Sequence, residues 1–537
     1  MNFRYMRTGI SFLLGVMMLA GVGELKAQDV QGNTLKFGRL LRLIDSYYVD
    51  STKVDDLTEK AIVEVLHNLD PHSVYISKEE VEKMNEPLQG NFEGVGISFN
   101  VFRDTLLVVT TISGGPSEKV GLRAGDRIVE VDSKNIAGIG LKNTGVYDLL
   151  RGKKGTKVEL KVKRKGEINL LDFTVIRDKI PINSLDASYM LNANTGYIKL
   201  NKFSATTTSE FFDAIKILKE GSKLNNLVLD LRGNGGGYLT AAIELADQFL
   251  TAFKLVVYTE GLHAEKKEYN STPLGEFEQG KLILLIDEGS ASASEIVAGA
   301  IEDWDRGVLI GRRSFGKGLV QQPFPLTDGS MIRLTTAHYF TPSGRCIQKP
   351  YSNGVDEYQK DYMNRIENGE LFSMDSIVQN EAEKYETKVS NRTVYGGGGI
   401  MPDLFIPLDT SKYYAYYNNL LRKNVVYTGV LDIMDKSRGE FVQKYVDFNT
   451  FLQKFEITDD MVEKIIVAGE KEDVKRDDKS IEFARPLMKR QMKALIARDL
   501  FSMSHYFQVM NADDEAVVKA IEILNKKGAY EKILSGK

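Results

Sequence analysis

Apolar residues in the first ninety positions recur at the three- and four-residue spacing of amphipathic helices. One series comprises Leu35, Leu40, Leu41, Ile44 and Tyr48, and a second comprises Leu57, Ala61, Val65 and Leu69. The pair Asp70-Pro71 ends the second helix, because a residue that precedes proline disfavours helical geometry. Ser77, with Glu79 and Glu80 in the turn that follows it, starts a third helix. The sequence therefore predicts a helical N-terminal segment over residues 28–89.

Short alternating runs separated by glycine turns distinguish residues 90–176. The stretch FEGVGISF over residues 92–99 begins a strand among glycines, and Pro116 opens a short helix that Gly121 ends. Alternating apolar residues over 128–131 and 158–162 predict two further strands. This mixture predicts a small α+β domain.

Strands alternate with helices from residue 177 to residue 408, which is typical of a mixed α/β domain. Strands are predicted over 195–200, 226–231, 282–286, 308–310 and 329–340, and helices over 204–218, 239–249 and 296–304. Polar residues 351–392 predict an insertion over this domain. Residues 409–537 have helical periodicity, and their lysines are expected on solvated faces. The whole chain is therefore expected to be a multidomain α/β protein with helical regions at both ends.

Composition and charge narrow the function classes. The chain has 537 residues, which is too long for a single hydrophobic core, so several domains are expected. Its 70 basic and 74 acidic residues give a net charge of −4. That balance provides no strong field for nucleic acid. Cys346 is the only cysteine and the five histidines are scattered, so an internal disulfide is excluded and no metal-ligand spacing is present. We expect no nucleic-acid partner and no metal.

The first 27 residues have the pattern of a secretory signal peptide. Arg4 and Arg7 precede an apolar stretch over residues 10–22, and Ala27 provides a small residue at a plausible cleavage point. The stretch is shorter than the roughly 20 residues that span a bilayer. We expect an exported, periplasmic protein. An uncleaved segment that anchors the chain in the membrane is the alternative.

A serine-rich turn and a glycine-flanked lysine carry the most specific chemistry. The predicted strand over 282–286 leads through a small-residue loop with Ser290, Ser292 and Ser294 into the next helix. A hydroxyl at a helix start lies beside unpaired N–H groups and the positive end of the dipole. Lys317 follows within Ser-Phe-Gly-Lys-Gly. A buried neutral amine can accept a serine proton, so the two motifs together predict a serine–lysine hydrolase. Each motif alone is commonly a helix cap or a solvated turn.

A glycine-rich loop follows the predicted strand over 226–231. The residues Arg-Gly-Asn-Gly-Gly-Gly over 232–237 precede a helix and expose backbone N–H groups that can hold an anion. The loop lacks the Lys-Ser/Thr ending of a phosphate loop and the spacing and acidic follower of a dinucleotide site. Asp230 and Arg232 at the strand end are expected to pair and brace the loop.

These three motifs together resemble the carboxyl-terminal processing, or tail-specific, serine proteases. The resemblance implies that Ser292 is the nucleophile, Lys317 the general base and Gln321 the residue that orients the lysine. It also implies an oxyanion hole formed by the backbone N–H groups of Gly237 and Ala293.

Residues 90–176 resemble a PDZ domain, most specifically in the Gly-Leu-Arg-Ala-Gly-Asp stretch over 121–126. PDZ domains bind a peptide as an added strand and turn backbone N–H groups onto its terminal carboxylate. By this resemblance, Gly94, Val95, Gly96 and Ile97 would hold the C-terminus of the substrate. The alternative, in which the glycines only shape a hairpin, remains open.

The resemblance extends to other segments. The run over 396–403 is similar to the closing strand of the family's protease core, and the helical segment over 28–89 is similar to a part that can form dimer contacts. The domains expected are a signal peptide over 1–27, the helical segment over 28–89, the PDZ domain over 90–176, the protease core over 177–408 and a helical region over 409–537.

The combined expectation is an exported serine endopeptidase that selects protein or peptide substrates by their free C-termini and needs no cofactor. It would cleave through an acyl-enzyme. Two rivals remain: a peptide-binding periplasmic scaffold or chaperone with an inert protease-like core, and an esterase-like hydrolase that uses the same serine. A serine–histidine enzyme would need His338 as its base, but no convincing orienting acid lies nearby in the sequence.

Overall fold

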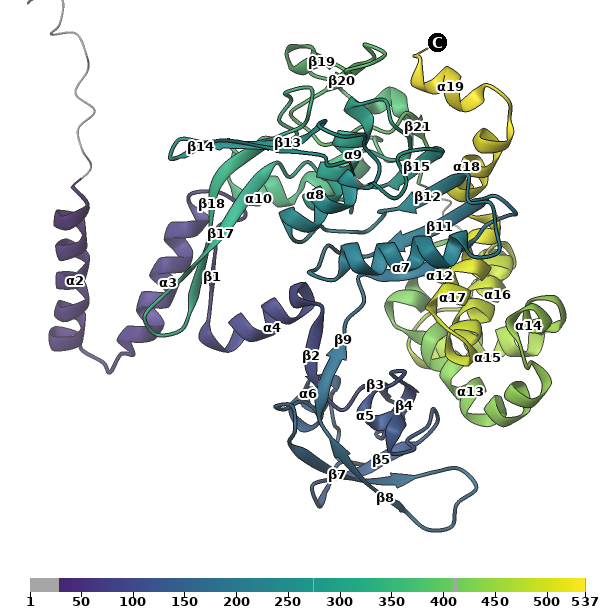
Figure 1. Ribbon diagram of the computed structural model, residues 1–537. Coiled ribbons are helices and arrows are strands. Elements are labelled where there is room, and N and C mark those ends of the chain that lie inside the picture. The colour runs from purple at the N-terminus through teal and green to yellow at the C-terminus, as the bar shows by residue number, and fades with distance from the viewer. Residues whose placement is uncertain (1–28, 274, 409–413, 537) are drawn as a thin grey trace, which may run out of the picture. The chain divides into compact units, whose positions relative to one another are not determined.

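The computed structural model describes residues 29–273, 275–408 and 414–536 (Figure 1). The predicted signal peptide over 1–27 lies outside these ranges. The chain divides into a unit that ends at Leu66 and a second unit from His67 onward. The first contains α2 (Val30–Tyr47) and most of α3 (Val54–His67), in agreement with the helical periodicity. Within the described ranges, none of the helices combines the length and the apolar character that crossing a membrane requires.

A six-stranded sheet forms the centre of the second unit. Its order is β10 (Leu185–Met190), β11 (Thr195–Leu200), β12 (Asn226–Asp230), β15 (Lys281–Ile286), β16 (Val308–Gly311) and β21 (Leu404–Phe405). The strands from β11 to β21 are parallel, and β10 is antiparallel to β11. Parallel strands covered on both faces have nearly continuous apolar sequences, as in the buried run over 282–286.

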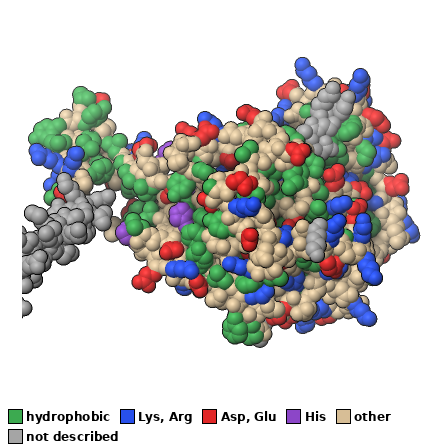
Figure 2. Space-filling model, turned by 90° about the horizontal axis from the view of Figure 1, so that it is seen from above, with side chains coloured by type: hydrophobic (Ala, Val, Ile, Leu, Met, Phe, Trp, Pro, Cys, Tyr) green, Lys and Arg blue, Asp and Glu red, His purple; other side chains and the backbone are tan. Residues whose placement is uncertain are grey.

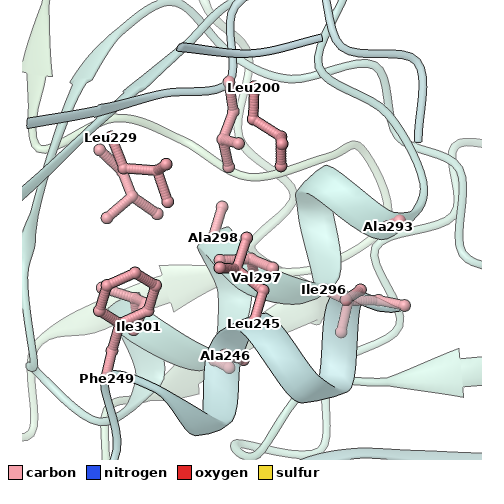
Figure 3. Packing of buried hydrophobic residues seen from close by; sticks show 14 of the residues in the cluster. Leu200, Leu229, Leu245, Ala246, Phe249, Ala293, Ile296, Val297, Ala298 and Ile301 are labelled. Atoms are coloured by element: carbon pink, nitrogen blue, oxygen red, sulfur yellow. The ribbon is translucent and has the colours of Figure 1, made fainter. Parts of the chain in front are cut away.

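Helices cover both faces of this sheet. On one face, α7 (Thr207–Lys219), α8 (Leu239–Asp247) and α9 (Ala293–Asp303) pack with Leu229 in the largest apolar cluster (Figure 3). On the other face, α18 (Glu515–Asn525) and α19 (Ala529–Leu534) pack with Val228. Leu229 and Val228 face opposite sides because successive strand residues alternate. The end of the chain therefore completes the core of this sheet, although the sequence pattern placed it in a separate helical region.

An antiparallel sheet of five strands lies in the same unit. Its members are β1 (Val74–Ile76), β18 (Met331–Phe340), β13 (Leu255–Gly261), β14 (Ala264–Asn270) and β17 (Leu319–Pro325), with both β1 and β17 paired to β18. The helix α4 (Lys78–Gln89) follows β1 and begins at Ser77, whose capping box with Glu80 agrees with the predicted helix start.

The PDZ-like domain, from Val95 in its core to Ile176 at the end of its last strand, is a separate small fold. Its sheet has the order β3 (Ile97–Val101), β4 (Leu106–Thr111), β5 (Arg127–Val131), β7 (Lys157–Lys163) and β8 (Leu171–Ile176), with β6 (Lys134–Asn135) paired to β5. Two short helices, α5 (Pro116–Lys119) and α6 (Asn143–Leu150), complete it. The antiparallel strands β2 (Asn91–Gly94) and β9 (Asp178–Pro181) form the two-stranded ribbon through which the chain enters and leaves this domain.

The insertion and the C-terminal region are largely helical. The insertion contains α10 (Val355–Gln359), α11 (Asp361–Glu367), the 3₁₀ turns η1 (Met374–Ser376) and η2 (Glu381–Glu383), and β19 (Lys384–Glu386), which pairs with β20 (Thr393–Tyr395) directly after the insertion. The C-terminal helices between residues 414 and 510 share an apolar core of their own. They are α12 (Tyr414–Arg422), α13 (Val425–Lys444), α14 (Phe448–Lys454), α15 (Asp459–Lys471), α16 (Asp478–Leu500) and α17 (Met503–Met510). A further 3₁₀ turn, η3 (Asn511–Asp513), precedes α18.

These elements confirm the predicted fold class, a mixed α/β core with an inserted α+β domain and helical regions on either side. One expectation is wrong: the run over 396–403 contains no strand, and the closing strand is β21, directly after it. Gly398 and Gly399 of that run instead pack against the loop that carries Lys317.

Figure 2 shows one face of the molecule, on which acidic and basic side chains are interspersed. This distribution agrees with the small net charge of −4.

Candidate active site

Ser292 lies on a strained turn between β15 and α9. Its backbone has φ of 53° and ψ of −110°, a conformation that costs a non-glycine residue about 1–3 kcal/mol. Hydrogen bonds hold the turn, because the Asn234 carbonyl accepts from the Ala291 N–H at 3.0 Å and from the Ser294 hydroxyl at 2.8 Å. Ser292 is therefore fixed at the N-terminus of α9, where the helix dipole stabilises negative charge.

Lys317 lies in the loop between β16 and β17. An ideal Cβ on Gly316 would lie 3.1 Å from the backbone nitrogen of Gly399, and one on Gly318 would lie 2.9 Å from that of Gln348. The flanking glycines thus allow the loop to pack tightly against two other backbone segments.

The carboxylate of Glu295 joins the serine turn to the lysine loop. Its Oε2 accepts hydrogen bonds from the backbone N–H groups of Ser292, at 2.8 Å, and Lys317, at 2.9 Å. Its Oε1 accepts from the Gly316 N–H at 2.7 Å and from the Ser314 hydroxyl at 2.6 Å. Glu295 is fully buried. A single oxygen atom therefore separates the backbone nitrogens of the two residues that the sequence paired.

Tyr339 makes a second connection between the same segments. Its backbone N–H donates to the Gly318 carbonyl at 2.9 Å, and its buried hydroxyl donates to the Ser292 carbonyl at 3.1 Å. The strand β18 thereby fixes both the serine turn and the lysine loop.

Burial and charge make the Lys317 ammonium give up its proton more readily than that of an ordinary lysine. Burial, together with the positive charge of Arg333, lowers the pKa of Lys317 from 10.5 to about 8, whereas Glu295 and Asp70 act to raise it. Burial and the nearby Lys317 also lower the pKa of His72 to about 4, so that imidazole is neutral at neutral pH. A substantial share of Lys317 is therefore unprotonated at weakly alkaline pH, as a general base requires.

The glycine-rich loop lies directly beside the serine turn. An ideal Cβ on Gly236 would lie 2.9 Å from the Ser292 Cβ and 3.0 Å from the Ala293 nitrogen. A parallel bridge to Phe203 uses the carbonyl of Gly236 and the N–H of Tyr238. The N–H groups of Gly237 and Ala293, the predicted oxyanion-hole donors, find no acceptor among the described residues. Two unpaired donors are thus available on the segments that meet at the serine.

Gln321 does not contact Lys317 through its amide in this structure. The Gln321 Nε2 donates to the Thr335 Oγ1 at 3.3 Å, and Thr335 Oγ1 donates to the Asp70 Oδ1 at 3.0 Å. A register shift between Val320 and Gln321 interrupts the pairing of β17 with β18 at this point. The structure thus brings Gln321 into a network with Asp70, one of the charges that act on Lys317.

Two other predictions about side chains can be compared with the structure. The guanidinium of Arg232 bonds both carboxylate oxygens of Asp230, so the expected brace at the strand end is present, and it also reaches Asp514 at the start of α18. The His338 ring contacts the Cys346 sulfur at 3.9 Å, which places its contact away from Ser292.

The predicted peptide-binding loop of the PDZ-like domain has its carbonyls tied inward. The Val95 carbonyl accepts from the Ser117 N–H at 3.1 Å and from the Ser117 hydroxyl at 2.7 Å, and the Gly96 carbonyl accepts from the Ile112 N–H at 3.0 Å. The N–H groups of Val95 and Gly96 have no acceptor in the described part of the chain. Gly94 and Ile97 flank them as the last residue of β2 and the first of β3.

Sequence reasoning missed Glu295 and Asp70. The spacing of Ser292 and Glu295 is that of a capping box, which could have drawn attention to the carboxylate. Asp70 accepts hydrogen bonds from the N–H groups of His72 and Ser73 at 2.7 and 2.8 Å. The sequence presented Asp70 only as the end of a helix, because its proximity to Lys317 depends on the pairing of β1 with β18.

Three family models match parts of the chain. Residues 194–357 match the model of peptidase family S41, residues 108–164 match a PDZ domain, and residues 416–502 match a family of unknown function. The chain is 38% identical over 354 residues to the carboxy-terminal-processing protease of Bartonella bacilliformis. The matched region is 64% of this chain and 80% of that protein.

Further relatives carry similar names. The carboxy-terminal processing protease CtpA of Bacillus subtilis is 35% identical over 351 residues, covering 64% of this chain and 71% of that protein. A solved photosystem II D1 C-terminal processing protease is 30% identical and covers 58% of this chain and 90% of that chain, with a TM-score of 0.33. The family models and the curated relatives, of which the Bartonella bacilliformis protease is covered over 80% of its length, identify the chain as a serine-type peptidase that belongs to the carboxy-terminal processing protease family.

Proposed function

We propose that this protease cleaves peptide bonds by a serine–lysine mechanism in which Ser292 is the nucleophile and Lys317 the general base. The observation that carries the proposal is the shared Glu295 oxygen, which accepts from the backbone of both residues. The lowered pKa of Lys317, about 8, supports its role as a proton acceptor.

The proton and the electrons move as follows. The Ser292 Oγ attacks the carbonyl carbon of the scissile bond while the neutral Lys317 Nζ takes the hydroxyl proton. The Gly237 and Ala293 N–H groups donate to the oxyanion that forms. Lys317 then gives its proton to the departing amine, which leaves an acyl-enzyme at Ser292. The neutral Lys317 Nζ then takes a proton from a water molecule, whose oxygen attacks the acyl carbon. Lys317 returns that proton to the Ser292 Oγ, which leaves as the regenerated serine.

Substrate choice is proposed to reside in the PDZ domain. The N–H groups of Val95 and Gly96 would donate to the terminal carboxylate of a protein tail, and the tail would add as a strand beside β3, which is the edge strand of its sheet. Gly94 and Ile97 would set the ends of this loop. The substrates are therefore proposed to be proteins or peptides with free C-termini.

One comparison tests both halves of the proposal. The purified protein and its Ser292→Ala and Lys317→Ala variants are given an unfolded polypeptide that ends in either a free or an amidated apolar C-terminus. We expect each variant to lose about 1,000-fold or more in kcat, because the nucleophile and its base act as a unit. Cleavage that survives in Ser292→Ala would overturn the mechanism, and equal cleavage of the two tails by the unaltered protein would overturn carboxylate capture.

Export is a separate proposal that rests on the signal-like residues 1–27. N-terminal sequencing of the protein isolated from its native cells should find a chain that begins near Gln28. A chain that begins at the first residue and sediments with membranes would instead indicate an anchor.

A further inference from the structure

The strand β4 of the PDZ domain is apolar on both of its faces. Leu106 and Val108 belong to the core of the domain, as alternate residues of a half-buried strand should. The intervening Leu107 and Val109 face the other way, yet each is only 4% exposed. An antiparallel sheet with one solvated face would carry polar residues there. The apolar run over 106–109 therefore indicates that something covers the outer face of this strand.

The cover is α13 of the C-terminal helical region. Leu431 is 1% exposed and forms one apolar cluster with Phe102, Leu107 and Val109. Tyr427 packs against the same cluster. Because residues four apart lie on one side of a helix, Tyr427 and Leu431 present a single apolar stripe. Without α13, three large apolar side chains of the PDZ domain would be exposed to water.

Charged groups border this cluster, with the basic side chains on the PDZ domain and the acidic ones on α13. Arg103 forms an ion pair with Asp432. Arg127 donates to Asp435 at 3.0 Å, and the two side chains are only 21% and 23% exposed. Asp432 and Asp435 are three residues apart, so they lie on the same side of α13.

A third basic side chain completes this border. The Nζ of Lys165 donates to the carbonyls of Asp435, at 2.9 Å, and Lys436, at 3.2 Å. Three basic residues from separate segments of the PDZ domain thus converge on one stretch of helix.

This contact leaves the proposed tail-binding edge open. In the PDZ sheet β4 lies between β3 and β5, and β3 is an edge strand whose outer side is unpaired in the described chain. A tail could add to β3 while β4 remains against α13. The chain enters and leaves the domain through the β2 and β9 ribbon, and Arg151 of the domain forms an ion pair with Glu86 of α4.

We propose that α13 is a docking helix that holds the PDZ domain in one position, so that a captured tail is delivered to the serine turn at high local concentration. This role would apply to the region of residues 416–502, which matches a family of unknown function. The inference rests on the proposed capture of free C-termini by the PDZ domain. A tethered site that is held at a fixed position raises the effective concentration of what it binds.

Charge reversal on α13 tests the proposal. In the Asp432→Lys/Asp435→Lys variant, the lysines would oppose Arg103 and Arg127, so the domain should detach. We expect faster hydrogen exchange over residues 102–111 and an about tenfold lower kcat/KM for a polypeptide with a free apolar C-terminus. Cleavage of the amidated polypeptide and the Kd of a fluorescent tail peptide should stay unchanged.

Rescue and control variants separate docking from misfolding. Adding Arg103→Asp and Arg127→Asp to the reversed helix restores opposite charges, and should recover both slow exchange and the tail-dependent rate. The Asp460→Lys/Glu463→Lys variant makes the same charge change on α15, at exposed positions that pair with Lys464 and Arg476, and should leave both readouts unaltered.

The outcomes are distinct from those that test the proposed function. Unchanged exchange in the charge-reversed protein, or an equal or higher rate on the free-tail polypeptide, would overturn the docking role. If the unaltered protein failed to prefer the free tail, carboxylate capture itself would fail, whatever the variants did.

Discussion

The backbone N–H of Lys317 donates to the Oε2 of Glu295 at 2.9 Å. The carboxylate thereby sets where the lysine loop lies relative to the serine turn, since the same oxygen also accepts from Ser292. Because a carboxylate has no hydrogen to donate, all four of the groups around it can be donors. A carboxamide in its place would turn N–H bonds toward some of those donors.

Glu295→Gln should therefore disturb the active site while it keeps the size of the side chain. We expect kcat to fall about 100-fold, because a small displacement between Ser292 and Lys317 is costly in catalysis. The matched control is Glu302→Gln, a buried glutamate on the same helix that bonds Arg345 instead. The control should lower the melting temperature with a much smaller loss of kcat. Equal losses of kcat in both variants would show that Glu295 acts only through stability.

The value of about 8 for the pKa of Lys317 predicts a pH profile with an acid limb near that pH. Since the neutral amine is the active form, kcat/KM should rise as pH increases through 8. Removing the negative charge in Asp70→Asn should lower this pKa and move the limb to lower pH. Removing the positive charge in Arg333→Gln should raise it and move the limb to higher pH.

The control for the pH profile is a carboxylate in the turn between β17 and β18, in the same sheet as Arg333. Asp328→Asn removes a carboxylate that likewise caps a turn, through Ser330, but is not among the charges that shift Lys317, so its profile should match the unaltered protein. Glu295 and the neutral His72 stay in place in all three variants. Shifts of the same sign in Asp70→Asn and Arg333→Gln would contradict the assignment of the limb to Lys317.

The sequence predicted the chemistry of the site more completely than its support. Ser292 and Lys317 occur in local motifs, and each motif specifies its own turn through glycines and small residues. Glu295 was concealed because a buried glutamate at the third position of a helix is also an ordinary capping residue. Asp70 reaches the site through strand pairing between distant segments, which a local pattern does not encode.

The helical C-terminal region illustrates the same limit. Its periodicity predicted helices, and helices are present. Periodicity identifies an apolar stripe without naming its partner, so α18 could not be assigned to the core sheet or α13 to the PDZ domain. The uninterrupted apolar run over 106–109 was a signal of double burial that the sequence did contain.

The same lysine should make the stability of the protein depend on pH. Because burial holds the pKa of Lys317 below its unfolded value of 10.5, the unfolded chain binds more protons between about pH 8 and 10.5. The contribution of this lysine to the free energy of unfolding therefore rises across that window and is lost as pH falls through 8. Lys317→Met should be more stable than the unaltered protein at pH 7 by about 2–3 kcal/mol.

Chemical denaturation at pH 7 and pH 10.5 checks this expectation. The advantage of Lys317→Met should shrink at the higher pH, where the native amine is neutral and no positive charge is buried. Lys464→Met, at an exposed position on α15, should show no such change. An advantage that is constant with pH would indicate better packing of methionine instead of relief from a buried charge.

The glycine loop yields a final prediction about the oxyanion hole. A Cβ on Gly236 would lie 2.9 Å from the Ser292 Cβ, and the φ of 103° strains any other residue. Gly236→Ala should therefore push the loop away from the serine turn and displace the Gly237 N–H from the oxyanion. Since loss of one such donor costs about 100- to 1,000-fold in rate, kcat should fall in that range with little change in KM.

Gly233→Ala is the control, because Gly233 also has a positive φ, of 68°, but open space around it. It should cost stability through backbone strain and retain most of kcat, whereas a comparable loss of kcat in both variants would mean that strain alone, and not the position of the donor, limits the reaction.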